Sequence, residues 1–190
     1  VEGDEHIRAI AAFGPRMTLS NGYVVNFSDN SARSTPRASL LQYLGERFDD
    51  PFIRSHARLA WQGLAAAPIN LNEQRGDLFH YARTLLQSPA DLGAPATLPE
   101  VDLFLPDLCV MISRFRDGRG RLWEWAGKGG HNNEHHNHND VGSYLLNIDG
   151  HRLLTETGAP EYNKDFFSAA KRYESIAARS LGHPVPLING

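Results

Sequence analysis

Apolar residues in the first part of the chain recur at helical spacing. Three stretches place apolar side chains every three or four positions: 35–48, 50–64 and 77–86. Thr35-Pro36 and Asp50-Pro51 are typical helix starts, with an N-capping side chain followed by proline at the first helical position. Residues 1–13 resemble the end of a further helix, and 21–30 are predicted to be a turn-rich connection. The pattern therefore predicts a helical domain over residues 1–88.

The pattern changes after Ser88. Prolines at positions 89, 95, 99 and 106 interrupt any regular helix, so 89–107 is predicted to be a linker. Four later stretches alternate apolar and polar side chains and are predicted strands: 108–115, 121–125, 141–148 and 151–155. A turn at 117–120 joins the first pair, and Asp149-Gly150, typical of a type I′ turn, joins the second. Helices followed by antiparallel strands predict an α+β protein whose second domain covers 108–190.

Composition limits the classes of partner. The 190 residues carry a formal net charge of −3, which disfavours a nucleic-acid-coating surface but allows an acidic substrate held by a few local cations. The single Cys109 excludes an intrachain disulfide framework, and no apolar run reaches the length of a membrane span. We therefore expect neither nucleic acid nor a membrane as a partner. Because the chain begins at Val1 and stops directly after an apolar run, we expect a piece of a larger protein.

Histidines gather in one short segment. Residues 129–140 hold four of the nine histidines of the chain. Imidazole is the commonest metal ligand and titrates near neutral pH. His136, His138 and Asp140 alternate directly before an apolar stretch, which predicts a site at the start of a β-strand with these three side chains on one face. The alternative is a histidine-rich solvated loop.

A metal site in this chain needs ligands from separate segments. With one cysteine present, the ligands must be histidine and carboxylate. Glu156 follows the second hairpin and His183 precedes Pro184, so both are candidates to join the histidines of the cluster. A His/Glu/His set suits Zn²⁺, and Mn²⁺ or Fe²⁺ is also chemically acceptable. Taken singly, Glu156 is better explained as a solvated turn carboxylate and His183 as a loop histidine.

Two neighbouring residues offer groups for a substrate. Arg172 provides a cation for an acidic group, and the phenol of Tyr173 is a possible acid or base. An arginine that pairs structurally and a tyrosine that packs explain the same residues equally well. The sequence alone leaves both interpretations open.

Five segments in this order resemble the heparinase II/III-like family of polysaccharide lyases. They are 128–132 (KGGHN), 136–144 (HNHNDVGSY), 153–158 (LLTETG), 171–173 (KRY) and 183–190 (HPVPLING). The resemblance is close over 105–190 and extends more weakly to Asn21-Gly22 and to 26–29. Each segment alone is a weak signal, whereas the joint pattern is specific.

The resemblance implies both a fold and a reaction. The implied fold is the C-terminal part of an incomplete (α/α) toroid, followed by an antiparallel β-sandwich that this chain truncates, with the active cleft between them. The implied reaction cleaves uronic-acid-containing polysaccharides, such as glycosaminoglycans or alginate, by β-elimination. A base removes the C5 proton, and donors must neutralise the carboxylate and the charge that develops. The family acts on polymers met outside the cytoplasm, which implies a periplasmic or secreted protein.

Residue roles follow from the same resemblance. His136 is similar to the catalytic histidine that faces the toroid, while His138, Glu156 and His183 are similar to a structural Zn²⁺ site. That metal would fix the segment carrying the catalytic histidine. Arg172 and Tyr173 would then bind substrate. Because residues i and i+2 share a face in a regular strand, separate roles for the two histidines require a local twist or bulge.

Two features depart from the family pattern. Relatives often carry aspartate where Glu156 stands, and a glutamate reaches farther into the site. The tyrosine that typically acts as acid or base in the toroid lies upstream of the segment present here. We therefore expect this chain to hold one wall of the cleft and to be inactive alone. The alternative functions are a non-catalytic carbohydrate-binding or metal-stabilised β-module and a zinc hydrolase that uses the His/Glu/His set.

Overall fold

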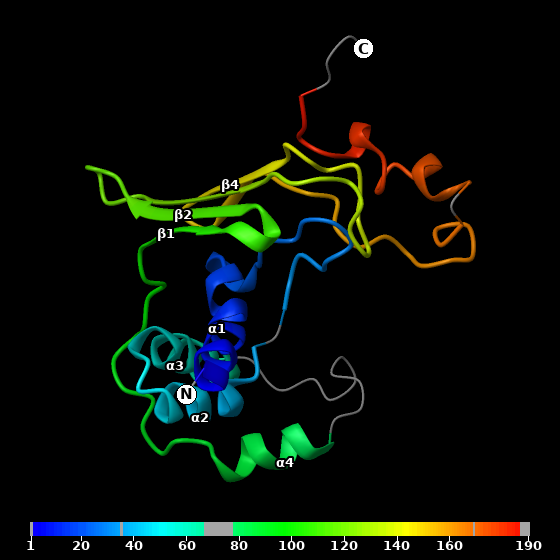
Figure 1. The fold of residues 1–190 in the computed structure, drawn as a ribbon. Coiled ribbons are helices and arrows are strands. Elements are labelled where there is room, and N and C mark those ends of the chain that lie inside the picture. Colours follow the sequence, from blue (N-terminus) through cyan, green and yellow to red (C-terminus); the bar gives the residue numbers. More distant parts are fainter. Residues whose placement is uncertain (1, 35, 67–77, 169, 187–190) are drawn as a thin grey trace. The chain divides into compact units, whose positions relative to one another are not determined.

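A computed structural model describes residues 2–34, 36–66, 78–168 and 170–186. The chain forms two compact units, one from Val1–Arg16 and Thr35–Pro99 and the other from Met17–Ser34 and Glu100–Gly190. The described residues contain four α-helices and one five-stranded antiparallel sheet, so the protein is α+β (Figure 1). None of the helices in these described ranges has the length and apolar character needed to cross a lipid bilayer.

The first unit is helical, as its apolar spacing predicts. Its helices are α1 (Glu2–Met17), α2 (Ala38–Arg47), α3 (Pro51–Ala66) and α4 (Leu78–Leu86). The start of α3 agrees with the sequence, because Asp50 Oδ1 accepts the backbone N–H groups of Phe52 at 2.9 Å and Ile53 at 3.1 Å. Two small clusters form the core of this unit, around Ile53 and around Trp61.

The boundaries of two helices differ from the prediction. Helix α2 begins at Ala38 rather than at Pro36, and its N-cap residue, Arg37, makes no side-chain capping hydrogen bond. The expected capping residues Thr35 and Asp77 lie outside the described residues. Helix α1 continues to Met17, four residues beyond the expected end, and contains Pro15. Residues 14–17 are Gly-Pro-Arg-Met, and the glycine and proline, which disfavour helix interiors, concealed the last turn.

The second unit is built on a meander of five strands. They are β1 (Val101–Leu105), β2 (Val110–Arg116), β3 (Leu122–Lys128), β4 (Tyr144–Ile148) and β5 (His151–Leu154), and they lie side by side in chain order (Figure 1). Both predicted hairpins are confirmed. Asp149 and Gly150 have φ angles of 49° and 76°, as a type I′ turn requires.

Strand β1 lies inside the segment 89–107 that the sequence predicted as a linker, so this prediction is wrong for residues 101–105. The strand is only five residues long, between Pro99 and Pro106, so prolines on both sides concealed it. It pairs with β2 at the edge of the sheet, where Leu103 lies opposite Ile112. Prolines just outside an edge strand leave its ladder intact.

The inner face of the sheet is covered by the segment 17–34. Leu19, Val25 and Phe27 pack with buried residues of β2, β3 and β4 in one apolar cluster. A buried ion pair anchors the same segment, because Glu124 accepts the Nε–H of Arg114 at 3.2 Å and the backbone N–H of Ser20 at 3.0 Å. The turn-rich connection therefore belongs to the sheet unit, although the sequence assigned it to the helical half.

The outer face of the sheet is unusually apolar for a surface. Phe104 lies opposite Met111 and Phe115 opposite Trp123 on neighbouring strands, and the first three of these side chains are exposed. The rings of Phe115 and Trp123 stack with centroids 6.3 Å apart. Antiparallel sheets that keep one face in water normally place polar side chains there. This sheet therefore has the composition of one that is covered on both faces.

Candidate functional site

The histidine cluster lies in the irregular loop 129–143 between β3 and β4, and not at the start of a strand. The expectation that His136, His138 and Asp140 share one strand face was therefore wrong. His136 has a φ angle of 59°, in the left-handed region, so the chain turns sharply there. As a result the side chain of His136 is 63% exposed, whereas His138 and Asp140 are fully buried. The backbone thus departs from strand geometry at His136. Such a departure is what allows His136 and His138 to face different surroundings.

A buried ion pair fixes the end of this loop. Lys128 Nζ, at the end of β3, lies 2.9 Å from Asp140 Oδ1 and also donates to Ser28 Oγ at 2.9 Å. The other oxygen, Asp140 Oδ2, accepts the backbone N–H of Ser28 at 2.7 Å. These contacts hold the histidine loop against residues 27–30.

His136 faces solvent with one ring nitrogen engaged. Its Nδ1 lies 2.6 Å from Asp29 Oδ2, and the phenol of Tyr162 donates to the same oxygen at 2.6 Å. The hydrogen bond to Asp29 raises the pKa of Tyr162 above its usual value. Desolvation and the negative charge of Asp29 raise it further. With Nδ1 directed at a carboxylate, Nε2 is the ring atom of His136 that remains available to a substrate.

His138, Glu156 and His183 come together in the interior of the second unit. All three are buried, and the rings of the two histidines lie with their centroids 5.3 Å apart. Glu156 Oε2 contacts His183 Nδ1, and Glu156 Oε1 accepts the hydroxyl of Ser143. The three residues that the sequence proposed as metal ligands are therefore neighbours, although 18 and 27 positions separate them along the chain.

The electrostatics of this cluster favour a neutral ring at His138. Burial, with the neighbouring His183 as the second cause, lowers the pKa of His138 to about 4. Burial likewise raises the pKa of Glu156, and its contact with His183 works in the opposite direction. An imidazole must be neutral to bind a metal, so His138 is in the right protonation state at neutral pH.

The cluster also contains unsatisfied nitrogens, which are rare in protein interiors. Both ring nitrogens of His138 and Nε2 of His183 are buried and have no hydrogen-bond partner. Their donor chemistry, two imidazoles and a carboxylate, fits Zn²⁺. Within the described ranges no three His, Cys, Asp or Glu side chains already surround one point as a metal-ligand group, and Glu156 contacts His183 directly. The residues thus fit the ion by chemistry and by their free nitrogens.

Arg172 and Tyr173, the predicted substrate-binding residues, both contact Asn137 of the histidine loop. Arg172 donates from Nε and Nη2 to the carbonyl oxygen of Asn137 at 3.2 Å and 2.7 Å, and its guanidinium lies 4.4 Å from the ring centroid of Phe166. Asn137 Nδ2 lies 3.0 Å from the hydroxyl of Tyr173. Two of the five N–H donors of Arg172 are therefore used to hold the loop.

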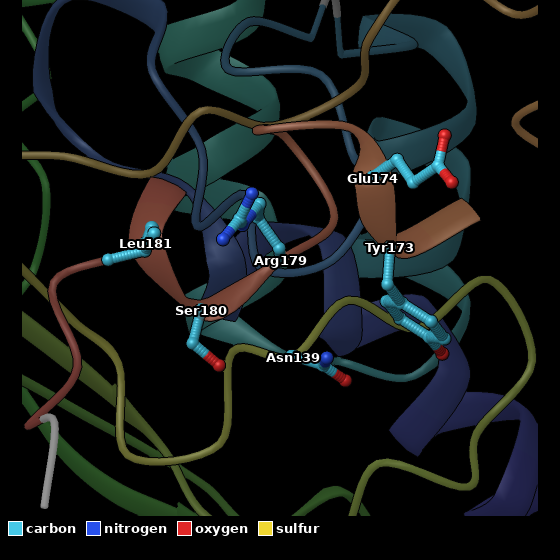
Figure 2. A pocket seen from close by; sticks show the side chains of 6 residues that line it. All are labelled: Asn139, Tyr173, Glu174, Arg179, Ser180 and Leu181. Atoms are coloured by element: carbon cyan, nitrogen blue, oxygen red, sulfur yellow. The ribbon is translucent and has the colours of Figure 1, made fainter. Parts of the chain in front are cut away.

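Tyr173 also lines an open pocket of about 450 Å³ (Figure 2). Its lining residues come from the histidine loop and from two short turns further along the chain: Asn139, Tyr173, Glu174, Arg179, Ser180 and Leu181. Arg179, which the sequence did not single out, is the cation of this lining set. The lining offers a guanidinium, a phenol, an amide and the Ser180 hydroxyl to a hydroxylated molecule, together with the carboxylate of Glu174, which balances the charge of Arg179.

The sequence did not identify Asp29 and Tyr162 as site residues. Asp29 lies 107 positions from His136 and 133 positions from Tyr162. Asp29 belongs to the segment 26–29 that weakly resembles the lyase family, and that was the one available signal. Nothing in the spacing of Tyr162 identifies its partner, because the contact depends on how two distant loops meet.

The arrangement combines a solvent-facing imidazole, oriented by a carboxylate, with a buried His/Glu/His cluster behind the same loop. The first group has the chemistry to accept a proton from a bound molecule, and the second has the donors for a structural metal. No protein-family model and no curated protein matches this chain.

Proposed function

We propose that this chain is part of a polysaccharide lyase that cleaves uronic-acid-containing polysaccharides by β-elimination. One observation carries the proposal: the exposed imidazole of His136 is bound at Nδ1 by Asp29, which directs Nε2 outward as a proton acceptor. The order of motifs that resembles the heparinase II/III-like family supplies the reaction class. Since such polymers occur outside the cytoplasm, we propose a periplasmic or secreted protein.

In the proposed reaction, His136 Nε2 takes the proton from C5 of the uronate. The electron pair of that C–H bond forms the C4–C5 double bond, and the C4–O4 bond breaks. The leaving O4 takes a proton from a second group, which in the resembled family is a tyrosine of the toroid. The products are a 4,5-unsaturated uronate and a new chain end, and no water is consumed.

We propose that His138, Glu156 and His183 hold a structural Zn²⁺. The unsatisfied nitrogens of both imidazoles support this, because an interior with several unpaired ring nitrogens is costly without a partner. When bound, the ion would supply a rigid tie between the histidine loop and the segments that carry Glu156 and His183. The chain's own residues do the rest, since the left-handed turn at His136 separates the reacting ring from the buried one.

The burial of this cluster disfavours a zinc hydrolase. A hydrolytic zinc ion needs an open coordination position that water and substrate can reach. His138 is fully buried, and Glu156 and His183 are each less than a tenth exposed. A metal held there would be closed off from a polymer, as in a structural site.

The toroid and the β-sandwich belong to the same proposal. The apolar outer face of the sheet, with Phe104, Met111 and Phe115 exposed, supports a sandwich because a second layer would cover it.

For substrate binding, we propose that Tyr173 contributes through the pocket, with Arg179 as the cation for a carboxylate. Arg172 then acts on the substrate through Asn137, by keeping the histidine loop in place.

The test is lyase activity in the full-length protein, followed as the ultraviolet absorbance of the unsaturated uronate on heparan-type chains and on alginate. His136→Ala is expected to reduce turnover by about 10²–10⁴-fold, the usual contribution of a general base. His135→Ala removes an exposed neighbour from the same loop and is the matched control, with activity expected within twofold of the wild type. Binding of the polymer without any unsaturated product, in the wild type as in the variants, would favour a non-catalytic carbohydrate-binding module instead.

A further inference from the structure

The carboxylate of Asp29 contacts two side chains from distant loops, His136 and Tyr162. Its Oδ2 accepts a hydrogen bond from Tyr162 at 2.6 Å and lies 2.6 Å from His136 Nδ1. The side chain of Asp29 is 12% exposed, although His136 itself is 63% exposed. Exposed ion pairs between two mobile side chains contribute little. Here the acidic partner is largely buried and bound twice, so it is a fixed point against which an exposed ring is oriented.

The backbone around Asp29 is held equally firmly. Ser28 has a φ angle of 57°, a left-handed conformation that a serine adopts only when its surroundings impose it. Those surroundings are the buried Lys128–Asp140 pair, which binds both the hydroxyl and the backbone N–H of Ser28. On the other side, the carbonyl oxygen of Asn30 accepts the backbone N–H of Ala159 at 3.1 Å. The same ion pair that anchors the histidine loop therefore also sets the position of Asp29.

A carboxylate at Nδ1 decides which tautomer a neutral imidazole adopts. The carboxylate only accepts hydrogen bonds, so the ring must carry its proton on Nδ1, and Nε2 keeps its lone pair. Without such a partner the proton can occupy either nitrogen, and a ring protonated at Nε2 cannot accept a proton there. The same principle governs the aspartate of serine-protease triads, which holds its histidine in the correct tautomer and orientation.

We infer that Asp29 is a positioning residue that fixes the Nδ1–H tautomer and the orientation of His136, and that Tyr162 holds the carboxylate of Asp29 in place. The inference rests on the proposed function for its catalytic consequence, since His136 Nε2 is the proposed proton acceptor. The tautomer itself is a property of this chain, and it is measurable without any substrate.

The first test is ¹⁵N NMR of the histidine rings in this chain at a pH where His136 is neutral, with His136→Gln to assign its signals. We expect Nδ1 of His136 to be protonated and Nε2 to be bare, and Asp29→Ala to move the ring towards the Nε2–H form. Asp165→Ala removes the aspartate of an exposed ion pair with Lys171 and is the control, expected to leave the His136 signals unchanged. An Nε2–H ring in the wild type, or one that Asp29→Ala leaves unchanged, overturns the inference.

The second test is kinetic and uses the full-length protein. Asp29→Ala is expected to lower kcat at least about tenfold while KM stays within twofold, because the ring would lose its orientation and not its contact with substrate. Tyr162→Phe removes only the hydrogen bond to Asp29 and is expected to give a smaller loss, again in kcat. If His136→Ala abolishes turnover but Asp29→Ala keeps kcat, the inference is wrong and the proposed function stands. If His136→Ala keeps turnover, the proposed function itself fails, whatever the tautomer.

Discussion

At the scale of single residues, one backbone torsion gives different surroundings to His136 and His138, which are two positions apart in the sequence. The left-handed φ of His136 turns its ring to solvent, while His138 enters the interior beside His183. The sequence showed that the cluster is unusual and which later residues join it. It did not show the partner of His136, because the contact with Asp29 spans 107 positions and depends on a buried ion pair.

That ion pair gives the residue-scale prediction. Lys128→Met removes the cation that lies 2.9 Å from the fully buried Asp140 and leaves a carboxylate without its charge partner. Breaking a buried pair in this way costs about 3–5 kcal/mol, so we expect a loss of that size in the free energy of unfolding measured in denaturant. Lys171→Met, which breaks the exposed pair with Asp165, is the control and is expected to cost less than about 1 kcal/mol. Equal losses in the two variants would contradict the anchoring role of Lys128.

At the scale of elements, local signals succeeded where a single turn or cap determines the structure. Asp50-Pro51 marks the start of α3 and Asp149-Gly150 marks the turn of the second hairpin, because each acts within a few residues. Strand β1 was missed because Pro99 and Pro106, on either side of this five-residue strand, indicated a linker. Residues 136–140 were mistaken for the start of a strand, since alternation of polar residues does not reveal a left-handed turn.

The cap of α3 gives the element-scale prediction. Desolvation by burial would raise the pKa of Asp50, but hydrogen bonds from the backbone of Ile53 and from Arg8 outweigh it and hold the pKa below its usual value. A lowered pKa stabilises the folded state above the unfolded value of about 3.9, and this stabilisation is lost as the pH falls through the folded pKa. Asp50→Asn keeps a capping oxygen but loses the ion pair with Arg8.

We therefore expect α3 of the Asp50→Asn variant to be less stable than the wild type by about 1 kcal/mol near neutral pH, with the difference vanishing in acid. Hydrogen exchange of the α3 amides as a function of pH measures this directly. Asp49→Asn is the control: it breaks the pair of a 92% exposed carboxylate with Arg54 of α3, and because solvent screens such a pair the effect of pH is expected to be smaller than for Asp50→Asn. A difference that persists unchanged at low pH would show that the charge of Asp50 is not its source.

At the scale of the whole molecule, the chain consists of two units with separate cores, and both proposed sites lie in the second unit. The segment 17–34, the loop 129–143 and the loops after β5 supply every residue of the two sites. The outer face of the same sheet remains apolar and exposed. The sequence predicted the α+β class, because helical and alternating patterns are segregated along the chain. The sequence placed 17–34 in the helical domain, whereas this segment packs on the sheet. A segment without regular structure has no periodic pattern from which its packing partner can be predicted.

The proposed metal site gives the prediction at this scale. A ligand that binds only the folded state adds about 2.7 kcal/mol of stability at a free concentration of 100 times its Kd. We therefore expect Zn²⁺ to raise the Tm of the chain, one zinc per chain to be found by metal analysis, and a chelator to reverse both effects. His183→Ala should abolish the rise in Tm, whereas His131→Ala, at an exposed position of the loop 129–143, should retain it. If the purified chain contains no zinc and added Zn²⁺ does not change its Tm, the metal site is not part of the protein.

The central claim is that His136 starts an elimination rather than a hydrolysis, and cleavage of a uronate polymer by the full-length protein in oxygen-18 water tests it most directly. Elimination consumes no water, so in incubations shorter than the exchange of the reducing-end hemiacetal oxygen with solvent, the products are predicted to carry a 4,5-unsaturated uronate and no label at the new chain ends. The His136→Ala variant is predicted to release neither product above background. Saturated products that contain one labelled oxygen for each bond cleaved would show a hydrolase and would contradict the account.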